Sequence, residues 1–229
     1  MSFLSYLING ISLGSVYAII ALGYTMVYGI ARMLNFAHGD IIMVGGFVIF
    51  TMVSTLGLPP MVGVLVAVIA CTVLGVVIER VAYKPLRGAS SLAVLITAIG
   101  VSYLLQNVAL LIFGSNARQF TSVVNVPSLK LAGGALSISG VTLVTIITCI
   151  VIMVALTTFI NKTRVGQAML AVSEDTGAAT LMGINVNSTI AITFAIGSAL
   201  AAIAGALLCS AYPSLTPYTG SMPGIKAFV

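Results

Sequence analysis

Hydrophobic residues form six long and nearly uninterrupted runs along the chain, at residues 7–29, 41–56, 61–78, 92–113, 141–160 and 189–211. None of these runs alternates apolar and polar residues as a β-strand would, so each predicts a helix. A bilayer core about 30 Å thick needs roughly 20 apolar residues for each helical span. The pattern therefore predicts an all-α, polytopic transmembrane helix bundle with about six spans, built as a single domain over residues 1–229.

Composition favours the same class and excludes others. Of the 229 residues, 60% are hydrophobic and 6% are charged, whereas about a quarter of an ordinary soluble domain is charged. The net charge is +5, but the basic residues are scattered with no run of four, which argues against a nucleic-acid surface. The three cysteines lie inside apolar runs without metal-ligand spacing, which predicts packing roles. The first 31 residues carry no charge, so the first run is expected to remain in the mature protein.

The basic residues predict an orientation, because short cytoplasmic loops carry an excess of Lys and Arg. Parity of the six spans places one group of basic residues in the cytoplasm: Arg32, Arg80, Lys84, Arg87, Lys162 and Arg164. The opposite face receives Arg118, Lys130 and, at most, Lys226. This assignment puts the N-terminus outside and makes the 114–139 connection an external loop.

The stretch 35–46 lies where the first run stops and the second begins, and it combines polar residues with glycines: Asn35, His38, Gly39, Asp40, Gly45 and Gly46. A helix beginning near His38 would direct free N–H groups and a partial positive charge beyond its end. Discontinuous helices of this kind form anion or zwitterion sites in transporters. An ordinary cytoplasmic turn with Asp40 as N-cap is the alternative. Polar residues in the fourth run must also face protein or water: Thr97, Ser102, Gln106 and Asn107.

Two further patterns concern packing and catalysis. Small residues recur at helical spacing in the first and last runs, which predicts closely packed interior helices: Gly10, Gly14 and Ala18, and Gly197, Ala201 and Gly205. The sequence 10–14 also matches Gly-x-Ser-x-Gly, but that pattern needs a strained strand-to-helix turn and a nearby base. We interpret it as accidental. No phosphate-binding Gly-x-x-x-x-Gly-Lys-Ser/Thr loop is present, so the chain is predicted to carry no catalysis.

The long connection 161–187 can form one or two short helices. Five residues can make a small apolar face on them: Ala168, Met169, Val172, Ala179 and Met182. Glu174 and Asp175 can cap or enter the second helix. The pattern is typical of a cytoplasmic docking surface, and a solvated hairpin would look similar.

Several motifs in chain order resemble the permease subunits of bacterial branched-chain amino acid ABC transporters. In the connection 161–187 they are Arg164-x-Gly166, Ala171, Glu174-Asp175, Ala179 and Gly183-Ile184-Asn185. The resemblance continues in the segments 23–29, 35–39, 79–87 and 97–100, and covers essentially the whole chain. The family includes relatives that import other amino acids, urea or short amides. Leu170 departs from the family pattern, which often has a basic residue there.

The resemblance implies a subunit of the bacterial inner membrane that pairs with a second, similar permease and two cytoplasmic ATPases. A periplasmic binding protein would deliver the substrate. ATP and Mg would be bound by the ATPases, and this chain would hold no cofactor and no metal and would bind no nucleic acid. Family members continue beyond Val229, so the chain is expected to be a fragment that lacks C-terminal helices.

The same resemblance and the patterns above give two sets of candidate residues. The predicted substrate pathway comprises Asn35, His38, Gly39, Asp40, Gly45, Gly46, Thr97, Gln106 and Asn107. The predicted contact with the ATPases, within a cytoplasmic coupling loop at 161–187, comprises Arg164, Gly166, Glu174, Asp175, Ala179 and Gly183. A secondary transporter or channel, which would need coupling carboxylates or a filter, and a noncatalytic scaffold are the alternatives.

Overall fold

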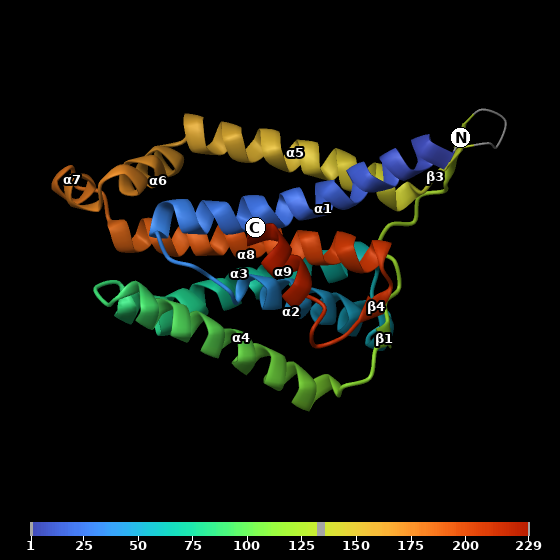
Figure 1. Cartoon of the computed structure of the whole chain (residues 1–229), viewed down its shortest axis with the longest axis horizontal. Coiled ribbons are helices and arrows are strands. Elements are labelled where there is room, and N and C mark those ends of the chain that lie inside the picture. The colour runs from blue at the N-terminus through green and yellow to red at the C-terminus, as the bar shows by residue number, and fades with distance from the viewer. Residues whose placement is uncertain (1, 132–135, 229) are drawn as a thin grey trace.

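The computed structural model describes residues 2–131 and 136–228 as a helix bundle with two small antiparallel sheets (Figure 1). Its long helices are α1 (Ser2–Ala31), α2 (His38–Phe50), α3 (Pro60–Ile78), α4 (Ser91–Phe113), α5 (Gly140–Lys162) and α8 (Val186–Ala211). Its shorter helices are α6 (Arg164–Glu174), α7 (Thr176–Leu181) and α9 (Ser221–Phe228). The π-helical turns η1 (Thr51–Thr55) and η2 (Glu79–Tyr83) extend α2 and α3, and the 3₁₀ turn η3 (Lys84–Leu86) follows η2.

Six helices in the described part of the chain are long and apolar enough to cross a membrane, which confirms the predicted number of spans. Their starts follow from local sequence. Pro60 stands at the first position of α3, where its missing N–H costs nothing. Side chains of Ser90, Ser139 and Asn185 accept backbone N–H groups at the starts of α4, α5 and α8.

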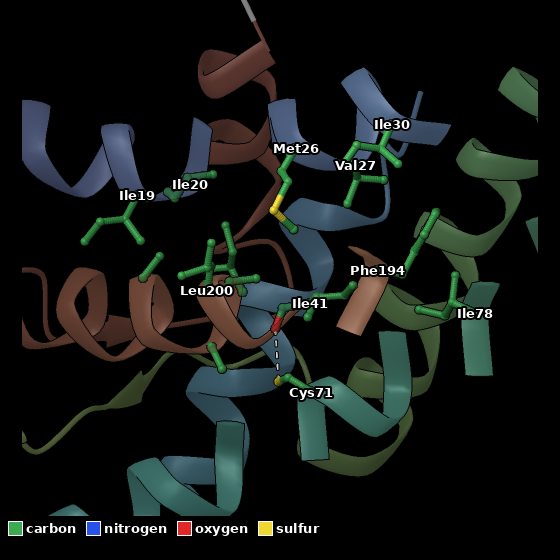
Figure 2. Packing of buried hydrophobic residues seen from close by; sticks show 14 of the residues in the cluster. Ile19, Ile20, Met26, Val27, Ile30, Ile41, Cys71, Ile78, Phe194 and Leu200 are labelled. Atoms are coloured by element: carbon green, nitrogen blue, oxygen red, sulfur yellow. Dashed lines mark hydrogen bonds between the residues drawn. The ribbon is translucent and has the colours of Figure 1, made fainter. Parts of the chain in front are cut away.

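Helix α8 occupies the centre of the bundle and packs against α1, α2 and α3 (Figure 1). Figure 2 shows the apolar contact of these four helices, in which side chains of α1 lie beside those of α2, α3 and α8. The Cys71 thiol also lies 3.6 Å from the Ile41 carbonyl oxygen, which ties α3 to α2. By contrast, α4 and α5 expose most of their side chains and lie at the periphery.

Small residues of α8 allow the neighbouring helices α1 and α2 to pack close to it, as predicted. A Cβ at Gly197 would lie 2.9 Å from the Val27 side chain, and one at Gly205 would lie 2.6 Å from the Ile42 carbonyl oxygen. The stripe in α1 behaves differently, because a Cβ at Gly10 or Gly14 would meet nothing within 4 Å. The prediction of close packing is therefore confirmed for α8 and wrong for these two positions within the described residues.

Short strands appear where the sequence predicted only a loop. Strand β1 (Arg118–Gln119) pairs with β4 (Ser214–Leu215), and β2 (Leu129–Leu131) pairs with β3 (Leu136–Ile138), both antiparallel. Strands of two or three residues are too short to give a periodic sequence signal. The β1–β4 pair joins the connection after α4 to the end of α8 and seats Leu215 in the core.

The basic residues separate to two ends of the bundle largely as predicted. Arg32 contacts the end of α6, and Arg87 contacts Asn187 at the start of α8, which places both at the end that carries α6 and α7. Arg118 lies at the opposite end, in the β1–β4 pair. Lys226 is an exception, because its ammonium nitrogen lies 5.9 Å from the ring centroid of Tyr17, in the middle of α1. Which end faces the cytoplasm stays a prediction.

We expect Gly205→Leu to destabilise the bundle by roughly 1–3 kcal/mol, because the new side chain overlaps the Ile42 backbone and forces α2 from α8. Thermal unfolding of the purified protein in detergent measures the effect. Gly14→Leu is the matched control, since its Cβ points into open space. Equal unfolding temperatures for the two variants would show that α8 does not set this packing.

Candidate functional site

Helix α2 begins inside the bundle rather than at its end. Helix α1 stops at Ala31, Arg32 adopts a left-handed conformation with φ +52°, and the chain returns along 33–37 to start α2 at His38 (Figure 1). The His38 ring reaches Gly23, where a Cβ would lie 3.0 Å from Cε1. Gly23 precedes the end of α1 by eight residues, or about 12 Å of helix. The segment 32–37 is therefore re-entrant.

Polar groups of the re-entrant segment find partners inside the protein, as backbone at membrane depth requires. The His38 N–H donates to the Asn35 carbonyl oxygen at 3.2 Å. The Tyr83 hydroxyl, fully buried, donates to Asn35 Oδ1 at 3.0 Å and lies 3.4 Å from the Leu34 carbonyl oxygen. Tyr83 thus holds this segment against η2.

A second short helix meets the start of α2. After α8 and β4 the chain turns at residues 217–220, and α9 runs beside the middle of α1 and the beginning of α2 (Figure 1). A Cβ at Gly39 would lie 2.5 Å from the Gly220 carbonyl oxygen and 3.2 Å from Gly224 Cα. Only glycines permit this approach of the two backbones.

A cavity of about 270 Å³ opens where α1, α2, α4 and α9 come together. It is slightly smaller than the roughly 300–1,000 Å³ of pockets for drug-sized ligands, which suits a smaller molecule. Its lining combines polar and apolar side chains: Tyr24, Asn35, Phe36, His38, Gly39, Asp40, Ile99, Ser102, Tyr103, Gln106, Ser221, Gly224, Ile225 and Phe228.

Polar side chains from three helices meet on one side of this cavity. The Gln106 side-chain nitrogen donates to Asp40 Oδ1 at 2.9 Å and lies 3.2 Å from Ser102 Oγ and 3.3 Å from Ser221 Oγ. Asp40 is 1% exposed and Gln106 is 8% exposed. The hydrogen bond from Gln106 therefore connects the otherwise loosely packed α4 to the start of α2.

Aromatic rings form the other side. Phe228 lies edge-on to Tyr24 with ring centroids 5.4 Å apart, and it lies 5.7 Å from Phe36. The His38 ring stands at 6.1 Å from Tyr24. Two buried polar atoms here, Tyr24 Oη and His38 Nε2, form no hydrogen bond of good geometry among the described residues, although backbone groups of Asn35 and Ile20 lie close to them. Because buried polar groups normally have partners, this pair indicates a site for a polar ligand.

The structure brings together five of the residues predicted for a pathway: Asn35, His38, Gly39, Asp40 and Gln106. The alternative with Asp40 as N-cap is wrong. Residue 37 precedes α2 without a side-chain cap, and Asp40 lies within the first turn. That alternative assumed a turn in water, whereas Asn35, Ala37 and His38 are buried.

Four predicted residues lie elsewhere. Gly45 packs against Ala202, and Gly46 packs against Leu215, so both serve helix contact. Thr97 does not line the cavity, and Asn107 is exposed and donates to the Tyr103 carbonyl oxygen at 2.8 Å. Asn107 follows Gln106 by one residue, which turns it about 100° around the helix.

Ser102 was named only among the polar residues of the fourth run, and the remaining cavity residues were not predicted as site residues, although α4 carries a signal. Ile99, Ser102, Tyr103 and Gln106 are spaced i, i+3, i+4 and i+7, which is one helix face. That spacing could have separated them from Thr97 and Asn107. The aromatic residues and α9 gave no such signal, because nothing local in their sequence shows what they face.

The connection 161–187 forms the two short helices α6 and α7, as predicted. Asp175 caps α7 by accepting the N–H groups of Gly177 at 2.7 Å and Ala178 at 3.0 Å. These bonds from Ala178 and Gly177 hold the pKa of the Asp175 carboxyl below its ordinary value. After α7, Gly183 has φ +82°. The Gly183 N–H donates to the Thr180 carbonyl oxygen, and the Ile184 N–H donates to the Ala179 carbonyl oxygen. This is a Schellman ending with Gly183 at its left-handed position.

The apolar face expected on these helices is only partly formed. Met169, Val172 and Ala179 are buried, whereas Met182 is 82% exposed and its neighbour Leu181 is 90% exposed. Met182 was wrongly assigned because it falls at the cap, where the helix period ends. Gly166 packs directly on the end of α5 at Phe159 and Ile160, and Arg164 and Glu174 are exposed.

Arg32 links the two parts of the site. One of its guanidinium nitrogens donates to the Ser173 carbonyl oxygen at 2.7 Å and to that of Glu174 at 3.3 Å. A cation at the C-terminal end of a helix is favoured by the helix dipole. The end of α6 is therefore bound to the residue that starts the re-entrant segment.

Comparison with known proteins agrees with this architecture. The family described as branched-chain amino acid transport system, permease component, matches residues 6–229. The high-affinity branched-chain amino acid transport system permease protein LivH of Salmonella typhimurium is 42% identical over 236 residues, which cover 99% of this chain and 77% of that protein. BraD of Pseudomonas aeruginosa, which carries the same description, is 40% identical over the same shares.

A more distant relative is the probable branched-chain amino acid transport permease protein LivH of Methanocaldococcus jannaschii. It is 28% identical over 217 residues, which cover 92% of this chain and 67% of that protein. No solved structure matches the chain at a significant level. The chain therefore belongs to the family of permease components of branched-chain amino acid transport systems and is a multi-pass membrane permease of a bacterial ABC transporter.

Proposed function

We propose that this chain forms part of the membrane pathway that moves leucine, isoleucine and valine inward, driven by ATP hydrolysed in partner subunits. The family match over residues 6–229 carries the proposal. Relatives at about 40% identity are named for high-affinity transport of branched-chain amino acids. The chain supplies no chemistry of its own and guides the substrate.

The cavity at the start of α2 is the proposed passage. Leucine, isoleucine and valine have a zwitterionic end and an aliphatic side chain. The cavity offers polar groups at Asp40 and Gln106 on one side and rings at Phe36 and Phe228 on the other. This division supports an amphipathic substrate of small size. Urea and short amides lack a branched aliphatic side chain, so they would make fewer apolar contacts with the aromatic side of the cavity.

The proposed partners are a second, similar permease, two cytoplasmic ATPases and a periplasmic binding protein. The surface at α6 and α7 supports a docking role, since Leu181 and Met182 project from it almost fully exposed. Exposed apolar side chains outside a lipid-facing helix favour protein contact. The basic Arg164 and the acidic Glu174 are exposed on the same pair of helices and can steer association.

Arg32 supplies a route from that docking surface to the cavity. A shift of α6 would act on Arg32 through its bonds to Ser173 and Glu174, and Arg32 lies six residues before His38. The re-entrant segment between them is short and buried in part. We therefore assign the coupling of ATPase motion to the α6–Arg32 contact and to Glu174, Asp175, Ala179 and Gly183 around it.

Uptake into vesicles tests the proposed function. The complete complex, reconstituted with ATP inside and loaded binding protein outside, is expected to accumulate leucine, isoleucine and valine. Accumulation should stop when the ATPase subunits are omitted, because the permease has no energy source. Transport of urea without any branched-chain amino acid would contradict the substrate. Uptake driven by an ion gradient without the ATPases would favour a secondary transporter.

We expect Gly39→Val to lower leucine uptake by about tenfold or more, because overpacking against the Gly220 backbone costs roughly 1–3 kcal/mol. The new side chain would push α9 from the start of α2 and deform the cavity. Uptake and recovery of the assembled complex are measured together. Gly29→Val is the control, since a Cβ there meets nothing within 4 Å. Normal uptake by a well-assembled Gly39→Val complex would show that the substrate does not pass through this cavity.

A second variant tests the docking surface. Gly183→Val places a β-branched residue at φ +82° and should destabilise the end of α7 by about 1–2 kcal/mol. Membrane insertion should stay normal, while ATPase docking weakens or hydrolysis proceeds without uptake. Gly88→Val is the control on the same side, because its position is open and its φ is not positive. Wild-type docking, hydrolysis and uptake in Gly183→Val would show that 161–187 is only a connector.

A further inference from the structure

The four acidic residues of the chain have very different surroundings. Glu174 and Asp175 are exposed on α6 and at the start of α7. Glu79 is buried but forms an ion pair with Arg87. Asp40 alone is a buried carboxylate without a cation, because it forms no ion pair among residues 2–131 and 136–228.

Asp40 lies in the first turn of α2, where the helix dipole favours a negative charge, but its immediate surroundings in the described part of the chain hold no Lys or Arg. Its side-chain hydrogen bonds come from neutral groups, the Gln106 amide at 2.9 Å and the Ser102 hydroxyl. Lys226, although it belongs to α9, lies over the Tyr17 ring instead. A carboxylate inside a membrane protein is costly to keep charged unless a partner is present, so it usually marks a functional site.

A second buried group on the cavity has an unused donor. The Tyr24 hydroxyl belongs to a residue that is 5% exposed, and its proton has no acceptor among the described residues, while the Asn35 backbone N–H faces its oxygen. The Tyr24 ring is fixed by edge-on contacts with His38 and Phe228. A hydroxyl held this way is a donor for an anionic group of a ligand.

We infer that the cavity binds the zwitterionic end of an amino acid, with the Asp40 carboxylate as counter-ion of the substrate ammonium and the Tyr24 hydroxyl as donor to the substrate carboxylate. This inference rests on the proposed function and adds roles for particular residues. Gln106 positions Asp40 through their hydrogen bond, and the ring of Phe36 faces the aliphatic part of the substrate.

With these roles, the subunit recognises the free amino group of its substrate. Side-chain selection among leucine, isoleucine and valine then belongs elsewhere, because rings accept any of the three. A membrane site that holds only the common zwitterion also binds weakly enough to release its substrate, as a transport pathway requires.

The decisive variant is Asp40→Asn, tested in the complete reconstituted complex with leucine-loaded binding protein. Asparagine keeps the shape and can still accept the Gln106 hydrogen bond, so only the charge is lost. Maximal leucine uptake should fall by roughly 30-fold or more, as on removal of one partner of a buried charge pair. Hydrolysis stimulated by the loaded binding protein should continue, since docking does not involve Asp40. Asp40→Glu, which keeps the charge, should retain more uptake than Asp40→Asn.

Tyr24→Phe is the second variant, and it keeps the ring contacts while removing the hydroxyl. Uptake should fall by about fivefold, the effect of one hydrogen bond. The control is Thr72→Val on α3, where the hydroxyl bonds only the Val68 carbonyl oxygen of its own helix at 2.6 Å and does not line the cavity. Its uptake should equal that of the wild type.

The outcomes separate the two proposals. Failure of the wild-type complex to take up any branched-chain amino acid would overturn the proposed function. Wild-type uptake that is unchanged in Asp40→Asn would show that Asp40 is a neutral packing group and would overturn the counter-ion role. If Asp40→Asn does not assemble, Tyr24→Phe decides: normal uptake in that variant would refute the zwitterion site, and a selective loss would support it.

Discussion

The meeting of two interrupted helices inside the bundle determines the rest of the site. Non-helical backbone cannot face lipid, because its N–H and C=O groups would lack partners there. The segments 32–37 and 212–220 are therefore partly buried against the helices, and the Gly39 and Gly220 backbones come into direct contact. This contact fixes where α2 and α9 begin, and the cavity is the space left beside it.

Helix α8 makes that enclosure possible. In a membrane, helices associate through close packing of small residues rather than by hiding apolar surface from water. Gly197 and Gly205 let α1 and α2 approach α8 closely, and Gly75 of α3 packs against Ser198. Helix α4 is held differently, since much of its surface is exposed and the Gln106–Asp40 hydrogen bond joins it to α2. The rigid side of the cavity thus belongs to α1 and α2, and the side that can move most easily belongs to α4.

Arg32 connects the two regions for which we propose a function, the helices α6 and α7 and the cavity at the start of α2. The left-handed conformation of Arg32 ends α1 and at the same time aims its guanidinium at the end of α6. Arg32 thus joins the end of α6, which we propose as part of a docking surface, to the start of the re-entrant segment. A displacement at α6 reaches the start of α2 through few intervening groups, which suits a subunit driven by motion in its partners.

Much of this protein is determined by its sequence alone. Six apolar runs require six spans, Asp175 and Gly183 define the ends of α7, and the polar stretch around His38 marks an interrupted helix. These features are local, because hydropathy, capping and positive φ depend on neighbouring residues. The tertiary structure alone decided what those residues face. It turned Gly45 and Gly46 to packing, brought α9 to Gly39 and left Asp40 without a cation. Such outcomes depend on contacts between segments far apart in the chain, which no local pattern encodes.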